Sequence, residues 1–190
     1  MSKVTLVTGG ARSGKSVYGE QLALTCGGDN VLYIATSVIV DEEIKERVKK
    51  HLERRPLAWE TEERYKNLIG LNDLESFRFA KVILFDCIGF GLNNLLYDVL
   101  LDWDNPDDSE LSIVECKIIK ELGDLISLCR KEGKDLVMIT NEVGDSLVPE
   151  NRISRTFRDL LGKANCFAAA KSDSVILMTC GLSLELKEGR

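Results

Sequence analysis

A glycine-rich loop near the start of the chain limits the possible folds more than any other feature. Gly9 is followed by four residues and then by Gly14, Lys15 and Ser16, which matches the pattern G-x-x-x-x-G-K-[ST]. The loop follows VTLVT, an apolar run typical of a buried strand, and precedes a stretch with helical character. The sequence therefore predicts a strand, a phosphate-binding loop and a helix in direct succession.

The residue types of the loop suit the phosphates of a nucleotide. Glycines let the backbone curl around an anion, and the following helix adds the partial positive charge of its N-terminus. Lys15 is expected to reach the β- and γ-phosphates, and the Ser16 hydroxyl is expected to bind Mg²⁺. The alternative is a tight strand-to-helix turn without a ligand, which the match at all three anchor positions disfavours.

Beyond the loop, short apolar runs rich in β-branched residues alternate with longer amphipathic stretches. This alternation is typical of an α/β fold with a mostly parallel sheet flanked by helices. Strands are expected at residues 4–8, 31–35, 81–86, 135–140 and 174–179, with LSLELK near the C-terminus as an edge strand. Helices are expected at residues 15–26, 41–55, 88–101, 110–132 and 152–171. The length suits one nucleotide-binding domain over residues 1–190.

The overall charge argues against a protein that binds nucleic acid through a basic surface. The chain has 25 Lys and Arg against 31 Asp and Glu, a net charge of −6. Its six cysteines form no CxxC pair, so a zinc site is not expected. No apolar run approaches the roughly 18 to 20 residues that span a bilayer, and no leader precedes the glycine loop. We therefore expect a cytoplasmic protein.

Two acidic features invite a metal interpretation. Asp86 ends the apolar run KVILFD, and the carboxyl end of a buried strand is where open α/β sheets bind ligands. Alone, such an Asp is more often a turn or helix cap, but together with the glycine loop it is a candidate Mg²⁺ ligand. DWDNPDDSE, residues 102–110, lacks the central glycine and distal glutamate of a calcium loop, so we interpret it as a solvated connection.

The only histidine of the chain lies in the charged segment DEEIKERVKKHLERRP, residues 41–56. The segment predicts a helix that Pro56 ends, and at 100° per residue His51 falls at the edge of a narrow apolar stripe. A histidine at such a boundary is usually a packing residue. The alternative is chemical: a neutral imidazole is an available nucleophile, and neighbouring arginines would keep it neutral and hold the phosphates that it attacks.

Three segments, taken together, carry a family resemblance. They are TGGARSGKS, YIATSVIVDEEIKERVKKHLERRPLAWETEE and TNEVGDSLVPENRISRTFRDLLGKAN. In order and spacing, from the first strand to about residue 180, they resemble the bifunctional adenosylcobinamide kinase and adenosylcobinamide-phosphate guanylyltransferase of cobalamin assembly. The histidine segment and TNEVG make the resemblance specific, because phosphate-loop proteins in general do not share them.

The resemblance implies a RecA-like parallel sheet and a homotrimer with its active site near subunit contacts. It also implies two reactions on a corrinoid substrate. The hydroxyl of the aminopropanol arm of adenosylcobinamide is phosphorylated with ATP or GTP. GMP then passes from GTP to a histidine and on to the new phosphate, which gives adenosyl-GDP-cobinamide and releases pyrophosphate.

The resemblance also assigns residues. The histidine that becomes guanylylated precedes a basic segment and a proline, and at that position this chain has His51. Many relatives carry two adjacent histidines there, whereas this chain has Lys50 before His51. Lys15 joins His51 as catalytic, and Ser16 and Asp86 are the implied metal ligands. The implied nucleotide-site residues are Gly9, Gly10, Ala11, Arg12, Ser13, Gly14, Lys15, Ser16, Ala35, Thr36, Ser37, Leu52, Glu53, Arg54, Arg55, Glu63 and Asp86. GFGLNNLL after Cys87 departs from the bulkier residues of the family.

Two other functions compete with this interpretation. A guanine-nucleotide switch usually reads guanine through an Asn/Thr-Lys-x-Asp segment, whereas this chain has TNEVG without the lysine. A kinase of another small molecule would use the loop but not His51. The arginines that follow TNEVG, Arg152, Arg155 and Arg158, either help substrate or subunit contacts or face solvent.

Overall fold

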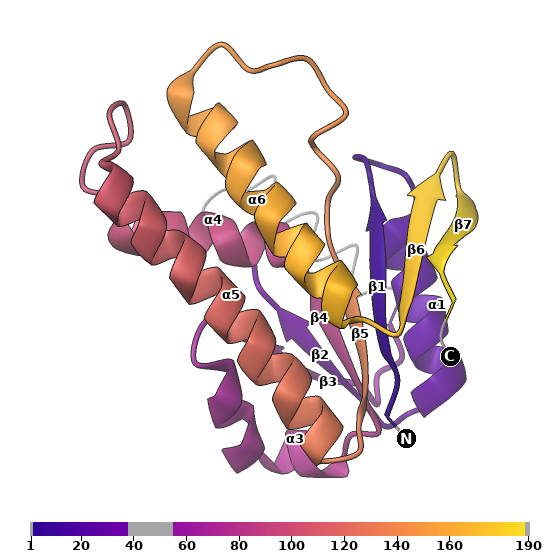
Figure 1. Ribbon diagram of the computed structural model, residues 1–190. Helices are drawn as coiled ribbons and strands as arrows, with labels where there is room; N and C mark the ends of the chain where they lie inside the picture. Colours follow the sequence, from indigo (N-terminus) through magenta and orange to yellow (C-terminus); the bar gives the residue numbers. More distant parts are fainter. Residues whose placement is uncertain (1, 38–54, 189–190) are drawn as a thin grey trace.

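The computed structural model describes residues 2–37 and 55–188. These residues form a seven-stranded sheet with helices packed against it (Figure 1). The strands are β1 (Val4–Gly9), β2 (Val31–Ala35), β3 (Glu60–Glu63), β4 (Val82–Asp86), β5 (Asp135–Ile139), β6 (Ser174–Thr179) and β7 (Leu182–Lys187). Their order in the sheet is β3-β2-β4-β5-β1-β6-β7. All neighbours pair in parallel except β6 and β7, which form an antiparallel hairpin.

Helices lie on both faces of the sheet. They are α1 (Lys15–Gly27), the 3-10 helix η1 (Leu68–Asp73), α3 (Glu75–Phe79), α4 (Ile88–Val99), α5 (Asp108–Lys131) and α6 (Arg152–Lys171). In Figure 1, α1 covers one face, while α4, α5 and α6 cover the other. The predicted α/β fold, a mostly parallel sheet flanked by helices, is confirmed.

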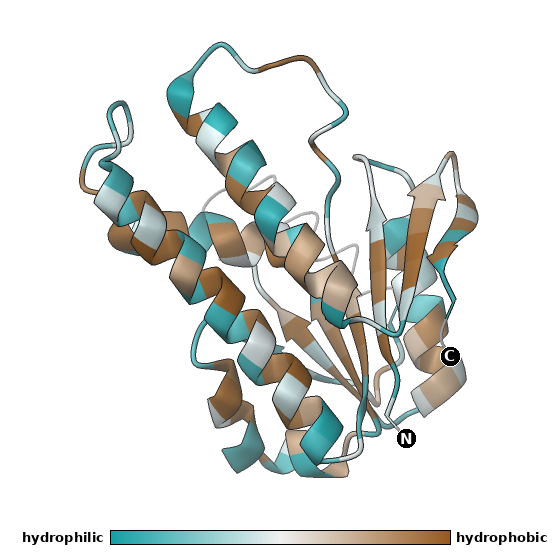
Figure 2. Ribbon diagram, in the orientation of Figure 1, coloured by the Kyte–Doolittle hydropathy of each residue, from teal (hydrophilic) through white to brown (hydrophobic). Residues whose placement is uncertain are grey.

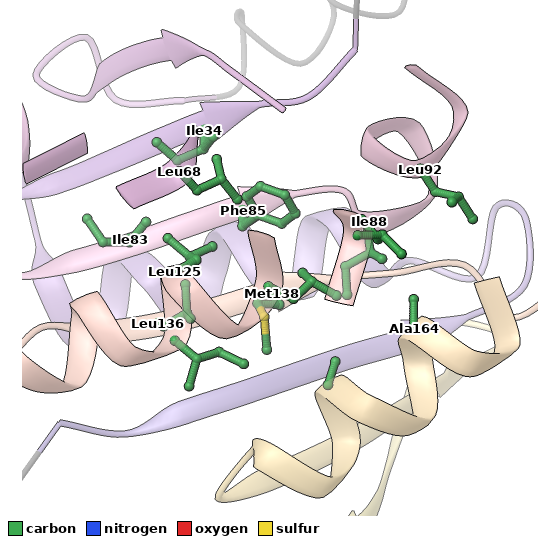
Figure 3. Packing of buried hydrophobic residues seen from close by; sticks show 14 of the residues in the cluster. Ile34, Leu68, Ile83, Phe85, Ile88, Leu92, Leu125, Leu136, Met138 and Ala164 are labelled. Carbon is green, nitrogen blue, oxygen red and sulfur yellow. The ribbon is translucent and has the colours of Figure 1, made fainter. Parts of the chain in front are cut away.

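The alternation of side chains along the strands builds two cores. Ile34, Ile83, Phe85, Leu136 and Met138 point toward α4, α5, α6 and η1 (Figure 3). Their neighbours in the same strands, such as Tyr33, Leu84, Val137 and Ile139, pack on the α1 side. Strands buried on both faces read as nearly continuous apolar runs, and these central strands are mostly brown in Figure 2.

The parallel arrangement brings the carboxyl ends of six strands, β1 to β6, to one edge of the sheet. The register pairs Ala35 with Asp86, Asp86 with Ile139, and Ala35 with Glu63. Gly9 ends β1 at the same edge, two strands away from β4. Ligands of open α/β sheets bind in this position, so the fold places the glycine loop and the predicted Asp86 at a common edge.

The predicted strands and the helices at 15–26, 88–101, 110–132 and 152–171 are confirmed within a few residues, as is the edge strand LSLELK. The predicted helix at 41–55 lies outside the described residues except for Arg55. The sequence did not predict β3, η1 or α3. In residues 2–37 and 55–188, no helix combines the length and apolar character needed to cross a membrane.

Residues 102–107 form an exposed connection except for the buried Pro106 and half-buried Trp103. The side chain of Asp107 accepts a hydrogen bond from the Ser109 N–H and forms a capping box with Glu110 at the start of α5. Asp107 and Glu110 therefore cap α5. In residues 2–37 and 55–188, no group of three or more His, Cys, Asp or Glu side chains is placed to hold a metal ion.

Candidate functional site

The glycine loop joins the end of β1 directly to the first turn of α1. Gly14 has φ 95° and ψ 0°, a left-handed conformation that favours glycine, and it is the N-cap of α1 without a side chain to cap the helix. The Tyr18 N–H donates to the Gly14 carbonyl at 3.0 Å, which begins the helical hydrogen-bond ladder. Because no acidic side chain stands in the first turn, the positive end of α1 suits an anion.

Neighbouring strands hold the loop from both sides. On one side, the Glu142 N–H donates to the Gly9 carbonyl at 3.0 Å. On the other, the Gly181 N–H in the turn between β6 and β7 donates to the Ser13 carbonyl at 3.1 Å. A Cβ on Gly9 would lie 2.5 Å from the Met178 carbonyl oxygen, so only glycine fits there. The curvature of the loop is therefore fixed by backbone contacts with two adjacent segments.

Ser13 carries an unsatisfied polar atom inside this loop. The residue is only 7% exposed, and its Oγ is the one buried side-chain polar atom without a hydrogen-bond partner in residues 2–37 and 55–188. A buried hydroxyl without a partner is costly, and native structures usually satisfy it with water or a ligand. The hydroxyl is thus available to a group that enters the loop.

Lys15 begins α1 and folds back over the loop. Its Nζ donates to the Gly10 carbonyl at 3.0 Å, among other interactions. The ammonium group therefore lies over the same backbone that would surround an anion. This matches the predicted role of Lys15 as a phosphate-binding cation.

Asp86 stands at the end of β4 and accepts a hydrogen bond from a buried tyrosine. The Tyr33 hydroxyl donates to Asp86 Oδ2 at 3.0 Å. Burial, and next the charge of Asp86, raise the pKa of Tyr33 well above its ordinary value. The tyrosine is therefore a fixed donor that aims the carboxylate, because its own ionisation is disfavoured.

Arg55 is the first described residue after Ser37, and its guanidinium group packs on Tyr33. Its guanidinium carbon lies 3.3 Å from the centroid of the Tyr33 ring, and its Nε lies 3.4 Å from Glu20 Oε1. The two charged side chains of this pair are 7% and 11% exposed. The pair thus connects α1, β2 and the end of the histidine segment in a largely buried contact.

Thr36 ties the end of β2 to the residue after Asp86. Its hydroxyl accepts from the Cys87 N–H at 2.7 Å and donates to the Cys87 carbonyl at 2.8 Å. The Asn94 amide of α4 donates to the Thr36 carbonyl at 2.6 Å. Burial raises the pKa of the Cys87 thiol to about 12, so this cysteine is an inert packing residue. Thr36 therefore fixes the backbone of Cys87, which directly follows Asp86.

The structure brings most of the predicted residues to one edge. The predicted residues at the carboxyl ends of the parallel strands are the loop residues 9–16, Ala35 at the end of β2, Thr36 and Ser37 after it, Glu63 and Asp86. Glu63 is exposed at the end of β3. His51, Leu52, Glu53 and Arg54 lie outside the described residues.

Three residues of this edge were not predicted: Tyr33, Glu20 and Asn94. Tyr33 is a polar aromatic side chain near the end of an apolar strand, which is a usable signal, because a buried tyrosine usually needs a hydrogen-bond partner. Glu20 and Asn94 gave no such signal, since their partners are distant in sequence.

The arginines after TNEVG bind two connections, one that precedes α6 and one that precedes α5. Arg155 Nη1 donates to the Pro149 and Glu150 carbonyls at 2.9 and 2.6 Å. Arg152 bonds Asn105 Oδ1 at 2.7 Å, and Arg158 Nη1 lies 3.4 Å from the Ser146 carbonyl. These guanidinium groups therefore stabilise the loops above the sheet as well as facing solvent.

Comparison with known proteins gives one family. The profile of the family described as "Cobinamide kinase / cobinamide phosphate guanyltransferase" matches residues 5–186. The protein named "Bifunctional adenosylcobalamin biosynthesis protein CobU" from Escherichia coli strain K12 is 40% identical over 182 residues, which cover 96% of this chain and 98% of that protein. The protein of the same name from Salmonella typhimurium shows the same identity and coverage.

Two more distant similarities complete the comparison. The "Bifunctional adenosylcobalamin biosynthesis protein CobP" of Pseudomonas aeruginosa is 33% identical over 182 residues, 96% of each chain. Among solved structures, the flagellar accessory protein FlaH of Methanocaldococcus jannaschii superimposes with a TM-score of 0.47 and 17% identity, over 98% of this chain and 79% of that one. A structural similarity at that level says nothing about activity.

Proposed function

The chain belongs to the cobinamide kinase and cobinamide phosphate guanylyltransferase family, and from that premise we propose that its single phosphate-binding loop serves both reactions, with His51 as the carrier of GMP. The chain is a bifunctional kinase and guanylyltransferase of adenosylcobalamin biosynthesis. A guanine-nucleotide switch and a kinase of another small molecule are not favoured, because the family match spans residues 5–186.

In the kinase reaction, the loop holds the nucleotide and Lys15 neutralises the phosphate that moves. The corrinoid hydroxyl oxygen forms a bond to the γ-phosphorus, the bond from that phosphorus to the β,γ-bridging oxygen breaks, and the hydroxyl proton is lost. The donor is ATP or GTP, and the nucleoside diphosphate, ADP or GDP, leaves. The N–H groups at the start of α1 and the Lys15 ammonium stabilise the negative charge that develops on the leaving group.

The residues present fit a magnesium ion. Mg²⁺ prefers oxygen ligands, and the hydroxyl of Ser16 and the carboxylate of Asp86 supply two of that kind at one edge of the sheet. The hydrogen bond from the Tyr33 hydroxyl holds Oδ2 of Asp86 in place. When bound, the ion would supply charge neutralisation across the β- and γ-phosphates.

In the guanylyltransferase reaction, His51 is the nucleophile. An imidazole nitrogen forms a bond to the α-phosphorus of GTP while the bond to the α,β-bridging oxygen breaks, and pyrophosphate leaves. A phosphate oxygen of the phosphorylated corrinoid then attacks the same phosphorus, the phosphorus–nitrogen bond breaks, and the histidine is restored. Splitting one displacement into two is the usual advantage of covalent catalysis.

The contact of Arg55 with β2 is the observation that carries this assignment. Thr36 fixes the start of the segment that contains His51 to the backbone beside Asp86, and Arg55 fixes its end to Tyr33 of the same strand. His51 precedes Arg55 by four positions in the sequence, and a stretch of four residues spans at most about 14 Å. Both anchors lie at the strand whose end pairs with Asp86, which supports a histidine within reach of the nucleotide.

The remaining parts of the proposal concern the wider context. We infer a homotrimer from the family resemblance alone. A cytoplasmic location is supported by six cysteines that are all unpaired, since a reducing compartment keeps thiols free. Leu52, Glu53, Arg54 and Glu63 complete the proposed nucleotide site.

The test separates the two reactions in one protein. His51→Ala should still transfer the γ-phosphate to cobinamide, while formation of GDP-cobinamide is lost, because only the second reaction needs the imidazole. Lys15→Ala should lose both. Lys50→Ala is the matched control, since it removes a neighbouring cation and keeps the histidine, and it should retain both products. Formation of GDP-cobinamide by His51→Ala would refute the assignment.

A further inference from the structure

A hollow of about 320 Å³ lies above the sheet, outside the glycine loop. Its walls come from α4, the connection around Trp103, the connection from β5 to α6, and the first turns of α6. In Figure 1 the connection from β5 to α6 extends beyond the carboxyl ends of the strands to the N-terminal end of α6. The lining is mostly apolar, with Trp103 and Phe157 as its aromatic members.

Short stretches of chain join the hollow to the nucleotide edge. Val143 lines the hollow and directly follows Glu142, whose N–H donates to the Gly9 carbonyl. Asn93 lines it from α4, and the next residue, Asn94, donates to the Thr36 carbonyl. Two of its walls are therefore continuous with residues that hold the glycine loop and the backbone beside Asp86.

The hollow has few polar groups, and they are of three kinds: amide, hydroxyl and guanidinium. Asn93 offers an amide, Ser146 and Ser154 offer hydroxyls, and Arg158 offers a guanidinium that is half-buried. Ligand sites are typically apolar hollows with a small number of such groups, which fix the orientation of the ligand. A corrin has methyl groups and carboxamide arms on its rim, so apolar walls with amide, hydroxyl and guanidinium groups match its periphery.

We propose that this hollow binds one edge of the corrinoid acceptor, with methyl groups against Trp103 and Phe157 and carboxamide arms toward Asn93, Ser154 and Arg158. This inference rests on the proposed function, which requires an acceptor beside the phosphate loop. The volume suits one edge of the macrocycle and leaves the aminopropanol arm outside the hollow, free to extend toward the nucleotide.

A second hollow on the described surface is larger but unsuitable. It measures about 590 Å³ and is lined by Asn30, Val31, Glu60 and residues of α3, at the amino ends of β2 and β3. That is the opposite edge of the sheet from the glycine loop, and an acceptor bound there could not reach the phosphates.

The test measures binding of cobinamide by equilibrium dialysis to the full-length protein, using the colour of the corrinoid. Ser154→Phe places an aromatic ring in the hollow and should weaken binding by about tenfold or more, which corresponds to about 1.4 kcal/mol. Asp159→Phe is the matched control, because it adds the same ring at an exposed position of α6. The control should bind cobinamide like the wild type. Equal affinity in Ser154→Phe and Asp159→Phe would overturn the proposal.

A second measurement guards against misfolding. Covalent labelling by GTP needs no corrinoid, so Ser154→Phe should keep it at the wild-type level. If the substitution abolishes labelling, Arg158→Met decides in its place, with weaker binding supporting the proposal and unchanged binding overturning it.

Sedimentation tests whether a second copy of the chain occupies the hollow instead. A changed oligomeric state of Ser154→Phe with unchanged cobinamide affinity would make the hollow a subunit contact. Wild-type protein that binds cobinamide but is never labelled would refute the histidine assignment and leave the hollow standing.

Discussion

Gly9 has the least room of the loop residues. Its φ is 157°, and an added Cβ would lie 2.5 Å from the Met178 carbonyl oxygen and 2.6 Å from Ser13 Oγ. We predict that Gly9→Ala lowers the free energy of unfolding by about 1–3 kcal/mol, the usual cost of overpacking, and weakens nucleotide binding. Thermal unfolding without and with GTP measures both effects.

Gly10→Ala is the control for this substitution. A Cβ at Gly10 would meet no atom within 4 Å, so the unfolding temperature without nucleotide should stay near that of the wild type. If Gly9→Ala were as stable as Gly10→Ala, the contact between β6 and the loop would not constrain the loop as described.

Tyr33 makes the stability of the protein fall at alkaline pH. Burial first, and then Asp86, raise its pKa in the folded state. The unfolded chain releases the proton near pH 10, whereas the folded chain retains it. The contribution of Tyr33 to stability is therefore complete below about pH 10 and is lost as the pH rises further. Denaturant unfolding at about pH 8 and about pH 11 should show a smaller decline in Tyr33→Phe than in the wild type.

The same variant has a spectroscopic check. Tyr33 is one of four tyrosines in the chain, and it should remain un-ionised in the folded protein at a pH that ionises it in the unfolded chain. The amplitude of the native phenolate absorbance should thus be the same in Tyr33→Phe and the wild type. A loss of about one tyrosine from the native titration would show that Tyr33 ionises and that its burial is overstated.

At this scale, the sequence predicted residues whose role follows from local spacing. The G-x-x-x-x-G-K-[ST] pattern located the loop, and a carboxylate after an apolar strand located Asp86. Contacts between distant residues could not be predicted in the same way. The hydroxyl of Thr36 bonds Cys87 across 51 positions, and Arg55 stacks on Tyr33, because the sheet brings β2 and β4 together.

Among the elements, α5 has the best-defined start. Asp107 caps it, and the hydrogen bonds from Ser109 lower the pKa of this carboxyl group. The stabilisation is present above the ordinary carboxyl pKa of about 3.9 and is lost as the pH falls through the lower folded value. Asp107→Ala should lower the unfolding temperature at neutral pH, since the N-terminal N–H groups lose their acceptor.

Asp107→Asn separates the cap from the charge. Asparagine also caps helices, so this variant should unfold at nearly the wild-type temperature at pH 7 and should show less loss of stability between about pH 5 and pH 2. An equal loss of stability in the Ala and Asn variants at pH 7 would contradict the role of the side chain as a hydrogen-bond acceptor.

The elements that sequence patterns missed share a physical cause. β3 is the run ETEE, an edge strand whose residues are mostly exposed, so it shows no apolar alternation. η1 and α3 have six and five residues, too few for a helical period to emerge. The central strands were predictable because both of their faces are buried. The start of α5 had a usable signal in Asp107 and Glu110, which match a capping box.

On the scale of the whole molecule, the central feature is one edge of the sheet. A single sheet edge presents a phosphate loop, a carboxylate and the two anchors of the histidine segment, and we propose that this one site serves two transfers. The first transfer moves the γ-phosphate, and the second moves the α-phosphate with its nucleoside. A bifunctional enzyme therefore attaches the α-phosphorus to the protein, whereas a simple kinase that transfers the γ-phosphate directly attaches none.

The decisive measurement is the fate of two GTP labels in the absence of corrinoid. The protein is incubated with Mg²⁺ and GTP labelled at the α- or the γ-phosphate, and the protein-bound label is counted before and after acid treatment. We predict that the α-label remains on the wild-type protein in an acid-labile form and that the γ-label does not. His51→Ala should retain neither, while Lys50→Ala should behave like the wild type. Absence of α-label from the wild-type protein, or its persistence in His51→Ala, would contradict the account.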